Sequence, residues 1–546
     1  MKTATLQRPL LLLVAAVAIG YLAAGCGRTQ QKAMDQVILS EETKGETLPA
    51  RKDAYRSAQP SSMELADRDY AGPNFNTEEY DHISENEFKE AAQNPLSTFS
   101  IDVDTASYSN VRRFITGSQL PPLDSVRIEE MINYFDYDYP QPKGEHPFSV
   151  ITEISACPWN AGNRLIHIGL QGKSLDYNNL KPCNLVFLID SSGSMEDANK
   201  LPLLKQSLKL LVGELNAGDR VAIVAYAGSA GLVLPSTPAG KKDAIIAAMD
   251  RLQAGGCTAG GAGLQLAYKT ARENLVEGGN NRVILCTDGD FNVGVSSTGD
   301  LVRMMEENRK TDIYLTICGF GMGNYKDGRM EQISKAGNGN YFYIDGIKEA
   351  RKVFVKEMRA NLFTIAKDVK IQIEFNPARV KAYRLVGYEN RLLANEDFNN
   401  DLKDAGELGA GHTVTALYEI IPAGSREGVN GTDPLKYQQT VISPDASKNG
   451  EIMTVKLRYK PPRKDISKLI VMPVIDGSTG LGKSSENFRF SSAVAGFGMI
   501  LRDSKFKKDL TLKQVLELAR SARGRDDEGY RSEFISLVET CALLKK

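Results

Sequence analysis

Five residues with oxygen-bearing side chains are spaced in a way that suits a metal ion. The first three follow an apolar run as D-x-S-x-S, the fourth lies in the glycine-rich loop GGCTAGG, and the fifth ends the run RVILCTD. Carboxylate and hydroxyl oxygens are hard donors, which suit an octahedral Mg²⁺ or Mn²⁺ that keeps some water ligands. The carboxylates supply the attraction, because neutral hydroxyls barely compete with the hydration of the ion. The predicted metal ligands are Asp190, Ser192, Ser194, Thr258 and Asp288.

The elements that would position these residues alternate between strands and helices, from about residue 180 to residue 362. Continuous apolar runs at 184–190 and 282–288 indicate buried strands, whereas the apolar spacing over 200–215 and 264–275 indicates helices. This alternation predicts a parallel sheet covered by helices on both faces. Ligands of such a sheet bind beyond the carboxyl ends of its strands, and the D-x-S-x-S motif lies at such an end.

The combination resembles the metal-ion-dependent adhesion site of the von Willebrand factor type A domain, whose sheet is Rossmann-like. All five motif positions match the family pattern. The resemblance implies that Ser192, Ser194 and Thr258 contact the cation directly, and that this cation is Mg²⁺ or else Mn²⁺ or Ca²⁺. Asp190 and Asp288 are then ligands that act through water or switch their contact. The resemblance also implies an open position that takes an Asp or Glu carboxylate from a partner protein.

The N-terminus has the features of an export signal. Lys2 and Arg8 precede an apolar run of fifteen residues, 10–24, which is too short to span a bilayer comfortably. The run ends in the sequence LAAGC (22–26), which resembles the bacterial lipobox and implies cleavage before Cys26 and diacylglycerol on its thiol. Because Gly27 follows instead of Asp, the resemblance to Gram-negative lipoproteins implies the outer membrane. We expect a protein of the bacterial cell envelope, anchored in the membrane by two or three acyl chains, with an ordinary signal peptide or a tail anchor with an incidental Cys as the alternatives.

The rest of the chain is expected to fold around the predicted A domain. A polar stretch before it predicts a disordered tether, with docking on the folded body as the alternative. Strand-like runs on both sides of the A domain are too short for separate domains, so we expect one β-sandwich into which the α/β domain is inserted. The predicted parts are a signal peptide (1–25), the tether (26–95), the first part of the sandwich (96–180), the A domain (181–363), the second part of the sandwich (364–475) and C-terminal helices (476–546).

Two flanking segments extend the resemblance to nearly the whole mature chain. They are NPLSTFSIDVDTASYSNVRRFI at 94–115 and FRFSSAVAGFGMILRDS at 488–504. Both resemble the ends of a family of bacterial von Willebrand A lipoproteins. That family is defined by sequence, so the resemblance implies a fold and an anchor but no biochemical role.

Composition and charge argue against several classes of function. The 67 Lys and Arg residues and 68 Asp and Glu residues give a net charge of −1, without the basic excess of nucleic-acid binders. The seven Cys and four His lack the spacing of clustered metal sites. Residues 477–484 match the P-loop pattern G-x-x-x-x-G-K-[ST], but the following residues are predicted to be helical and leave no parallel sheet for a nucleotide site. We therefore expect neither nucleic acid nor nucleotide as a partner.

The favoured function is a membrane-tethered protein-binding module whose cation bridges to a carboxylate of the partner. An enzyme is not expected, because no general base is apparent beyond the metal ligands themselves. Two alternatives stay open. One is a metal-assisted hydrolase that uses water on the same cation. The other is a structural envelope protein whose metal only holds loops together.

Overall fold

The strands predicted for the A domain form a mainly parallel sheet. The computed structural model describes residues 77–176, 180–256, 260–289, 298–323, 325–429, 433, 436–437 and 441–545, which lie within one compact unit, 72–546. The strand order is β10-β9-β8-β5-β6-β7, and neighbours are parallel except β6 and β7. The strands are β5 (Cys183–Asp190), β6 (Arg220–Tyr226), β7 (Ala230–Pro238), β8 (Asn280–Thr287), β9 (Ile313–Phe320) and β10 (Tyr341–Ile344).

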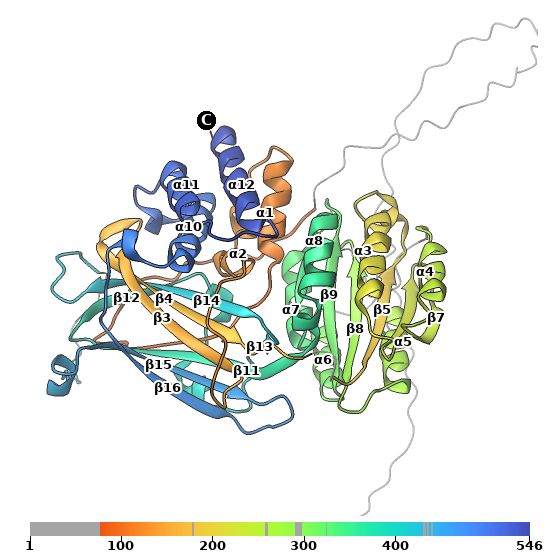
Figure 1. The fold of residues 1–546 in the computed structure, drawn as a ribbon, viewed down its shortest axis with the longest axis horizontal. Helices are drawn as coiled ribbons and strands as arrows, with labels where there is room; N and C mark the ends of the chain where they lie inside the picture. The colour runs from red at the N-terminus through yellow and green to blue at the C-terminus, as the bar shows by residue number, and fades with distance from the viewer. Residues whose placement is uncertain are drawn as a thin grey trace, which may run out of the picture. The chain divides into compact units, whose positions relative to one another are not determined.

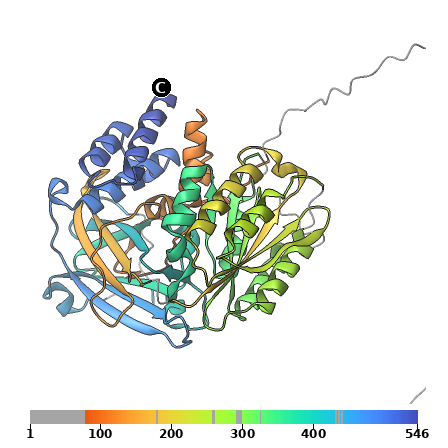
Figure 2. The ribbon, with the colours of Figure 1, turned by 45° about the vertical axis from the view of Figure 1, so that its right-hand side comes forward.

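Helices cover both faces of this sheet (Figures 1 and 2). Successive side chains of a strand point to opposite faces, so Phe187 of β5 packs with α3, α4 and α8, whereas Leu188 packs with α5, α6 and α7. Every residue of β5 is buried, as expected for a central parallel strand. The helices are α3 (Leu201–Glu214), α4 (Lys242–Asp250), α5 (Gly260–Glu273), α6 (Thr298–Arg309), α7 (Asp327–Ala336) and α8 (Ile347–Arg351).

Two antiparallel sheets each combine strands from before and after the A domain. The sheet β1-β12-β14-β4-β3 pairs β4 with β14, and in the sheet β13-β11-β15-β16 strand β11 also pairs with β2. One apolar core lies between the sheets and includes Ile168 of β4 and Ile371 of β11. The predicted sandwich with an inserted A domain is thus confirmed. The strands are β1 (Lys89–Glu90), β2 (Leu96–Ser100), β3 (Phe148–Cys157), β4 (Asn160–Gly172), β11 (Thr364–Phe375), β12 (Val380–Val386), β13 (Gly406–Gly409), β14 (Thr413–Pro422), β15 (Glu451–Lys460) and β16 (Lys468–Ile475).

Helices from both ends of the folded region cover the outer face of the sheet that contains β4 and β14 (Figure 1). Leu165 and Leu417 of these strands point into a core that the helices complete. None of the described helices combines the length and apolar character needed to cross a bilayer. The helices are α1 (Ala106–Thr116), α2 (Ile128–Asn133), α10 (Glu486–Leu501), α11 (Leu512–Ser521) and α12 (Tyr530–Leu544).

The end of the predicted tether is held in place by backbone hydrogen bonds. The N–H of Glu79 donates to the carbonyl of Tyr325 at 3.0 Å, and the N–H of Asp327 donates to the carbonyl of Glu79 at 3.2 Å. Strand β1 in the same segment pairs with β12. The prediction of a disordered tether over 26–95 is therefore wrong for residues 77–95, because backbone pairing, the ion pair of Glu78 with Arg113 and the packing of Phe88 on Phe506 fix this polar segment.

Candidate metal site

The D-x-S-x-S turn brings its oxygens together at the carboxyl edge of the parallel sheet. Asp190 is the last residue of β5 and is fully buried. Its Oδ1 accepts hydrogen bonds from the N–H (2.9 Å) and the Oγ (2.7 Å) of Ser192. Ser192 Oγ in turn lies 3.0 Å from Ser194 Oγ. Three of the five predicted ligands therefore lie within hydrogen-bond distance of one another along the turn.

Two neighbouring strand ends hold the other oxygen of this carboxylate. Oδ2 of Asp190 accepts hydrogen bonds from the hydroxyl of Tyr226, at the end of β6, and from that of Thr287, at the end of β8, at 3.1 and 3.2 Å. Burial raises the pKa of Asp190, and the negative charge of Asp288 adds to this effect, while hydrogen bonds from Ser192 oppose it. A cation between the two carboxylates would relieve their repulsion and favour their charged forms.

Lys200 is a charged residue of the site that the sequence analysis missed. Its Nζ lies 3.1 Å from Oδ2 of Asp288 and donates to the carbonyl oxygen of Ser194 at 2.8 Å. Only 5% of the residue is exposed. Its aliphatic stem lies against Gly321, just after β9, where a Cβ would come within 2.4 Å of Lys200 Cε. A lysine beside the start of a helix is usually solvated, so the sequence carries no clear signal for this contact.

Thr258 lies outside the described residues, but the loop that carries it is placed as far as Gly256. The carbonyl oxygen of Gly256 accepts a hydrogen bond from the N–H of Gly193 at 3.1 Å. The N–H of Gly255 donates to the carbonyl of Ser191 at 2.9 Å. The glycine-rich loop therefore contacts the D-x-S-x-S turn two residues before Thr258.

The donor set at this edge fits a hard divalent cation. Asp190 and Asp288 are both fully buried, and the charge of one acts on the other. In the described part of the chain, no group of three or more His, Cys, Asp or Glu side chains could hold a metal ion. A cation here would therefore need hydroxyl and water oxygens besides the two carboxylates, which is the donor set predicted for Mg²⁺. Cys26, the predicted lipidation site, lies outside the described residues.

Family models match successive stretches of the chain. A model described as von Willebrand factor matches residues 74–167. The model of the von Willebrand factor type A domain matches residues 184–356, which contain the parallel sheet and its helices. A model of the C-terminal region of the uncharacterized protein YfbK matches residues 360–544.

Individual proteins are similar over different shares of the chain. The uncharacterized protein YfbK of Escherichia coli is 44% identical over 470 residues, which are 85% of this chain and 81% of that protein. The uncharacterized protein sll0103 of Synechocystis is 29% identical over 193 residues, or 35% of this chain and 44% of that protein. A solved structure of a von Willebrand factor type A protein from Catenulispora acidiphila is 17% identical. It covers 74% of this chain and 99% of its own, with a TM-score of 0.40.

Proposed function

We propose that this chain, which belongs to the same family as YfbK of Escherichia coli and contains a von Willebrand factor type A domain, binds a protein partner through a divalent cation. A domain of this type is consistent with a protein-interaction module. In the proposal, an Asp or Glu carboxylate of the partner completes the coordination of Mg²⁺, or of Mn²⁺ or Ca²⁺. The residues that would hold the cation are Asp190, Ser192, Ser194, Thr258 and Asp288.

The observation that carries the proposal is the fixed position of Asp190 beside a second buried carboxylate. Both oxygens of Asp190 accept hydrogen bonds from the domain, so this carboxylate is oriented by its own chain. Asp288, also buried, faces the ammonium of Lys200. A bound divalent cation would supply the positive charge that attracts an outside carboxylate. The chain itself contributes oriented oxygens and a low-dielectric setting that strengthens this attraction.

A change in thermal stability tests the metal step. Unfolding of the full chain is followed with EDTA, Mg²⁺, Mn²⁺ or Ca²⁺. A cation at a hundred times its dissociation constant stabilises the folded state by about 2.7 kcal/mol, so at least one cation should raise the Tm. Asp190→Asn keeps the size of the side chain but removes its charge, and the shift should disappear.

The matched control for this test is Glu307→Gln, which removes an exposed carboxylate from α6 of the same domain. This variant should keep the full cation-dependent shift. An undiminished shift in Asp190→Asn would place the cation elsewhere and contradict the proposed site.

The partner step needs a separate measurement. Affinity capture from envelope extracts is compared in Mg²⁺ and in EDTA, for the natural chain and for Asp190→Asn. Capture that requires both the cation and Asp190, at an unchanged Tm without metal, supports a binding role. Cation-dependent stability without cation-dependent capture would instead favour a metal that only holds loops together.

We also propose that the chain is lipid-anchored at Cys26 in the bacterial cell envelope, at the outer membrane. The support is the short apolar run and the LAAGC sequence before this residue. Labelling of cells with a fatty-acid analogue should mark the natural chain and leave Cys26→Ala unmarked. Fractionation should then find the variant outside the outer membrane. Equal labelling of both chains would contradict the anchor.

No catalytic role is proposed for the site. Histidine is the side chain that most often acts as a general base, and three of the four histidines contact side chains that are not among the predicted metal ligands. His167 contacts Tyr139 and Ser491, and His146 contacts Tyr459. Metal-dependent turnover of phosphoesters or peptides that is lost in Asp288→Asn would overturn this part of the proposal.

A further inference from the structure

A cavity of about 370 Å³ lies where the A domain meets the sandwich. This junction cavity is bounded by α7 of the A domain, by the start of α2, by the short helical turn Glu389–Arg391 and by the segment 81–84. Asp81 and Lys335 are among six exposed residues at its mouth, Arg127 and Glu129 are buried, and the other three lining residues are half-buried. A volume of this size accommodates a small molecule. The charged lining residues are Asp81, Arg127, Glu129, Glu331, Lys335 and Glu389.

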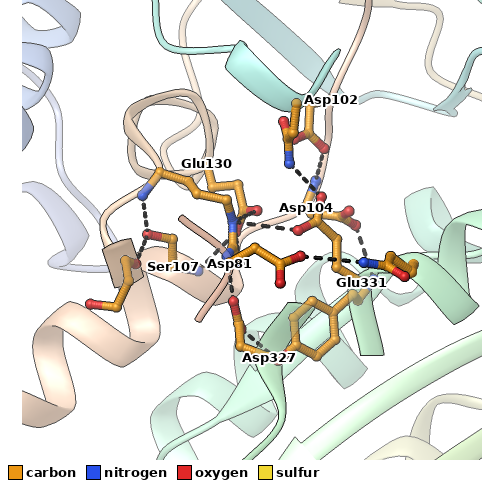
Figure 3. Close-up of polar contacts among 12 residues, drawn as sticks. Asp81, Asp102, Asp104, Ser107, Glu130, Asp327 and Glu331 are labelled. Carbon is orange, nitrogen blue, oxygen red and sulfur yellow. Dashed lines mark hydrogen bonds and ion pairs between the residues drawn. The ribbon is translucent and has the colours of Figure 1, made fainter. Parts of the chain in front are cut away.

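Most of the buried charge around the cavity is paired within a network of ion pairs (Figure 3). Arg391 lies 3.0 Å from a carboxylate oxygen of Asp102 and 2.9 Å from one of Asp104. Arg127, in the wall of the cavity, pairs with Asp327 of the A domain. These contacts leave the paired acids little capacity for a ligand. This junction network consists of Arg127, Arg391, Asp102, Asp104, Glu130, Asp327 and Glu331.

Glu129 is the exception in the wall of the cavity. It is 1% exposed, and no Lys, Arg or His side chain of the described residues forms an ion pair with it, although backbone N–H groups of Tyr388 and of Glu129 itself act on its carboxylate. Its Oε2 lies against Gly387, where a Cβ would be 2.7 Å away. The acid that acts on it most strongly, Glu389, is itself paired with Arg502 at 3.0 Å. Burial and the charge of Glu389 raise the pKa of Glu129 to about 7.

A buried carboxylate without a cationic partner is costly, and such groups in folded proteins call for an explanation. We propose that the junction cavity binds a small organic cation whose primary ammonium or guanidinium group pairs with Glu129. The charge of such a ligand would offset that of Glu129 and Glu389 together, and its N–H groups would form charge-assisted hydrogen bonds with the Glu129 carboxylate. The inference goes beyond the metal-dependent function and does not depend on it.

The surroundings favour an organic cation over a metal ion. The described residues offer no cluster of three or more His, Cys, Asp or Glu side chains that could hold a metal, and this includes the walls of the cavity. The lining is rich in charged side chains, which favours a hydrophilic ligand over an apolar one. The exposed carboxylate of Asp81 at the mouth adds a second acid for a ligand with two positive groups, such as a diamine.

Calorimetric titration of the full chain with cadaverine and with arginine amide tests the proposal. At a pH of about 8 the Glu129 carboxyl is ionised, and saturable binding of at least one of these cations is expected. A neutral diol of the same length as cadaverine should not bind. Glu129→Gln should weaken binding by about tenfold to a hundredfold, because it removes one charge-assisted contact. The matched control is Glu396→Gln, which removes an exposed carboxylate outside the cavity. This variant should leave the affinity unchanged.

Three further measurements distinguish loss of the cavity from misfolding, from the metal site and from binding of a protein side chain. If Glu129→Gln fails to fold, Asp81→Asn at the exposed mouth replaces it and should weaken binding severalfold. Asp190→Asn should bind the amine normally, which separates this site from the metal site. A blocked peptide that carries one lysine tests whether the cation is a protein side chain or a free amine. Lack of saturable binding by the natural chain, or equal affinity in the cavity variants, would overturn the proposal.

Discussion

The metal site and the junction network both bury several carboxylates, but they balance the charge differently. In the junction network, arginines provide the cations, and one of them, Arg391, contacts both Asp102 and Asp104. At the metal site, hydroxyl groups hold Asp190, and Asp288 faces the ammonium of Lys200. A guanidinium is always charged and has a rigid donor geometry, whereas a lysine ammonium lies on a flexible stem.

The comparison indicates two uses of the same acidic side chains. Arginines that come from the same chain and contact several acids at once form a permanent link between the A domain and the rest of the fold. Lys200 contacts one buried acid, Asp288, besides the exposed Asp197 at 3.6 Å, and such a lysine leaves a site where another cation can replace it. Glu129 belongs to neither group, since it lies beside the network without an ion-pair partner among the described residues.

Removal of Arg391 should have the largest effect on stability. Arg391→Met leaves Asp102 and Asp104 buried without this cation, and the loss of one partner from a buried ion pair costs about 3–5 kcal/mol. Urea unfolding measures the free energy. Arg303→Met breaks an ion pair with Asp300 in which the arginine side chain is 70% exposed, and it should cost less than about 1 kcal/mol. Equal losses in the two variants would mean that the network does not link the parts of the fold.

The second prediction concerns pH and distinguishes Glu129 from the paired acids. Burial and the charge of Glu389 raise its pKa from 4.5 to about 7 in the folded chain. The folded chain therefore keeps a proton that the unfolded chain releases between these values. The resulting stability is fully present below about pH 4.5 and is lost as the pH rises through about 7. A shift of this size is worth at most about 3 kcal/mol.

Urea unfolding between about pH 5 and pH 8 measures this loss as the difference between the natural chain and Glu129→Gln, which cannot titrate. The difference matters because Asp104 titrates in both proteins. Burial and the charge of Asp102 raise the pKa of Asp104 to about 7 as well. Asp102 and Glu389 also face Glu129 and are unchanged in the variant. Parallel pH profiles for the two proteins would show that Glu129 has an ordinary pKa in the folded chain.

The sequence predicted the architecture where the signal was local. The apolar runs at β5 and β8 and the helical spacing over α3 and α5 sufficed for the parallel sheet. The inserted arrangement followed from strand-like segments too short to fold alone. The order of residues 77–95 was missed, because it depends on contacts outside the segment, such as backbone hydrogen bonds to Tyr325 and Asp327 and the ion pair of Glu78 with Arg113.

The same division applies to the candidate sites. Asp190, Ser192 and Ser194 lie within one turn, so their spacing alone predicts that their oxygens meet. Lys200 reaches this turn because Gly321, in a distant loop, leaves room for its stem. Glu129 likewise becomes buried against Gly387. Contacts of this kind join elements far apart in the chain, and a single sequence contains no periodicity that predicts them.

Substitution of Lys200 tests whether the metal site differs from the junction network in having an exchangeable cation. It has the smallest expected effect of the three predictions. Lys200 Nζ lies 3.1 Å from Asp288, so it and a divalent cation would compete for the same carboxylate. Lys200→Met keeps an aliphatic stem against Gly321 but removes the charge. Calorimetry should show Mg²⁺ binding about tenfold more tightly, which corresponds to about 1.4 kcal/mol. Lys209→Met, which removes a surface ion pair with Asp250, should leave the Mg²⁺ affinity unchanged.

The opposite result would also be informative. If Lys200→Met bound Mg²⁺ more weakly, the ammonium would have to hold Asp288 in the orientation that the metal needs. The lysine would then act as the arginines of the junction network do, as a fixed partner of a buried acid. The contrast between a permanent link and an exchangeable cation would no longer hold, and a partner would have to bind without displacing Lys200.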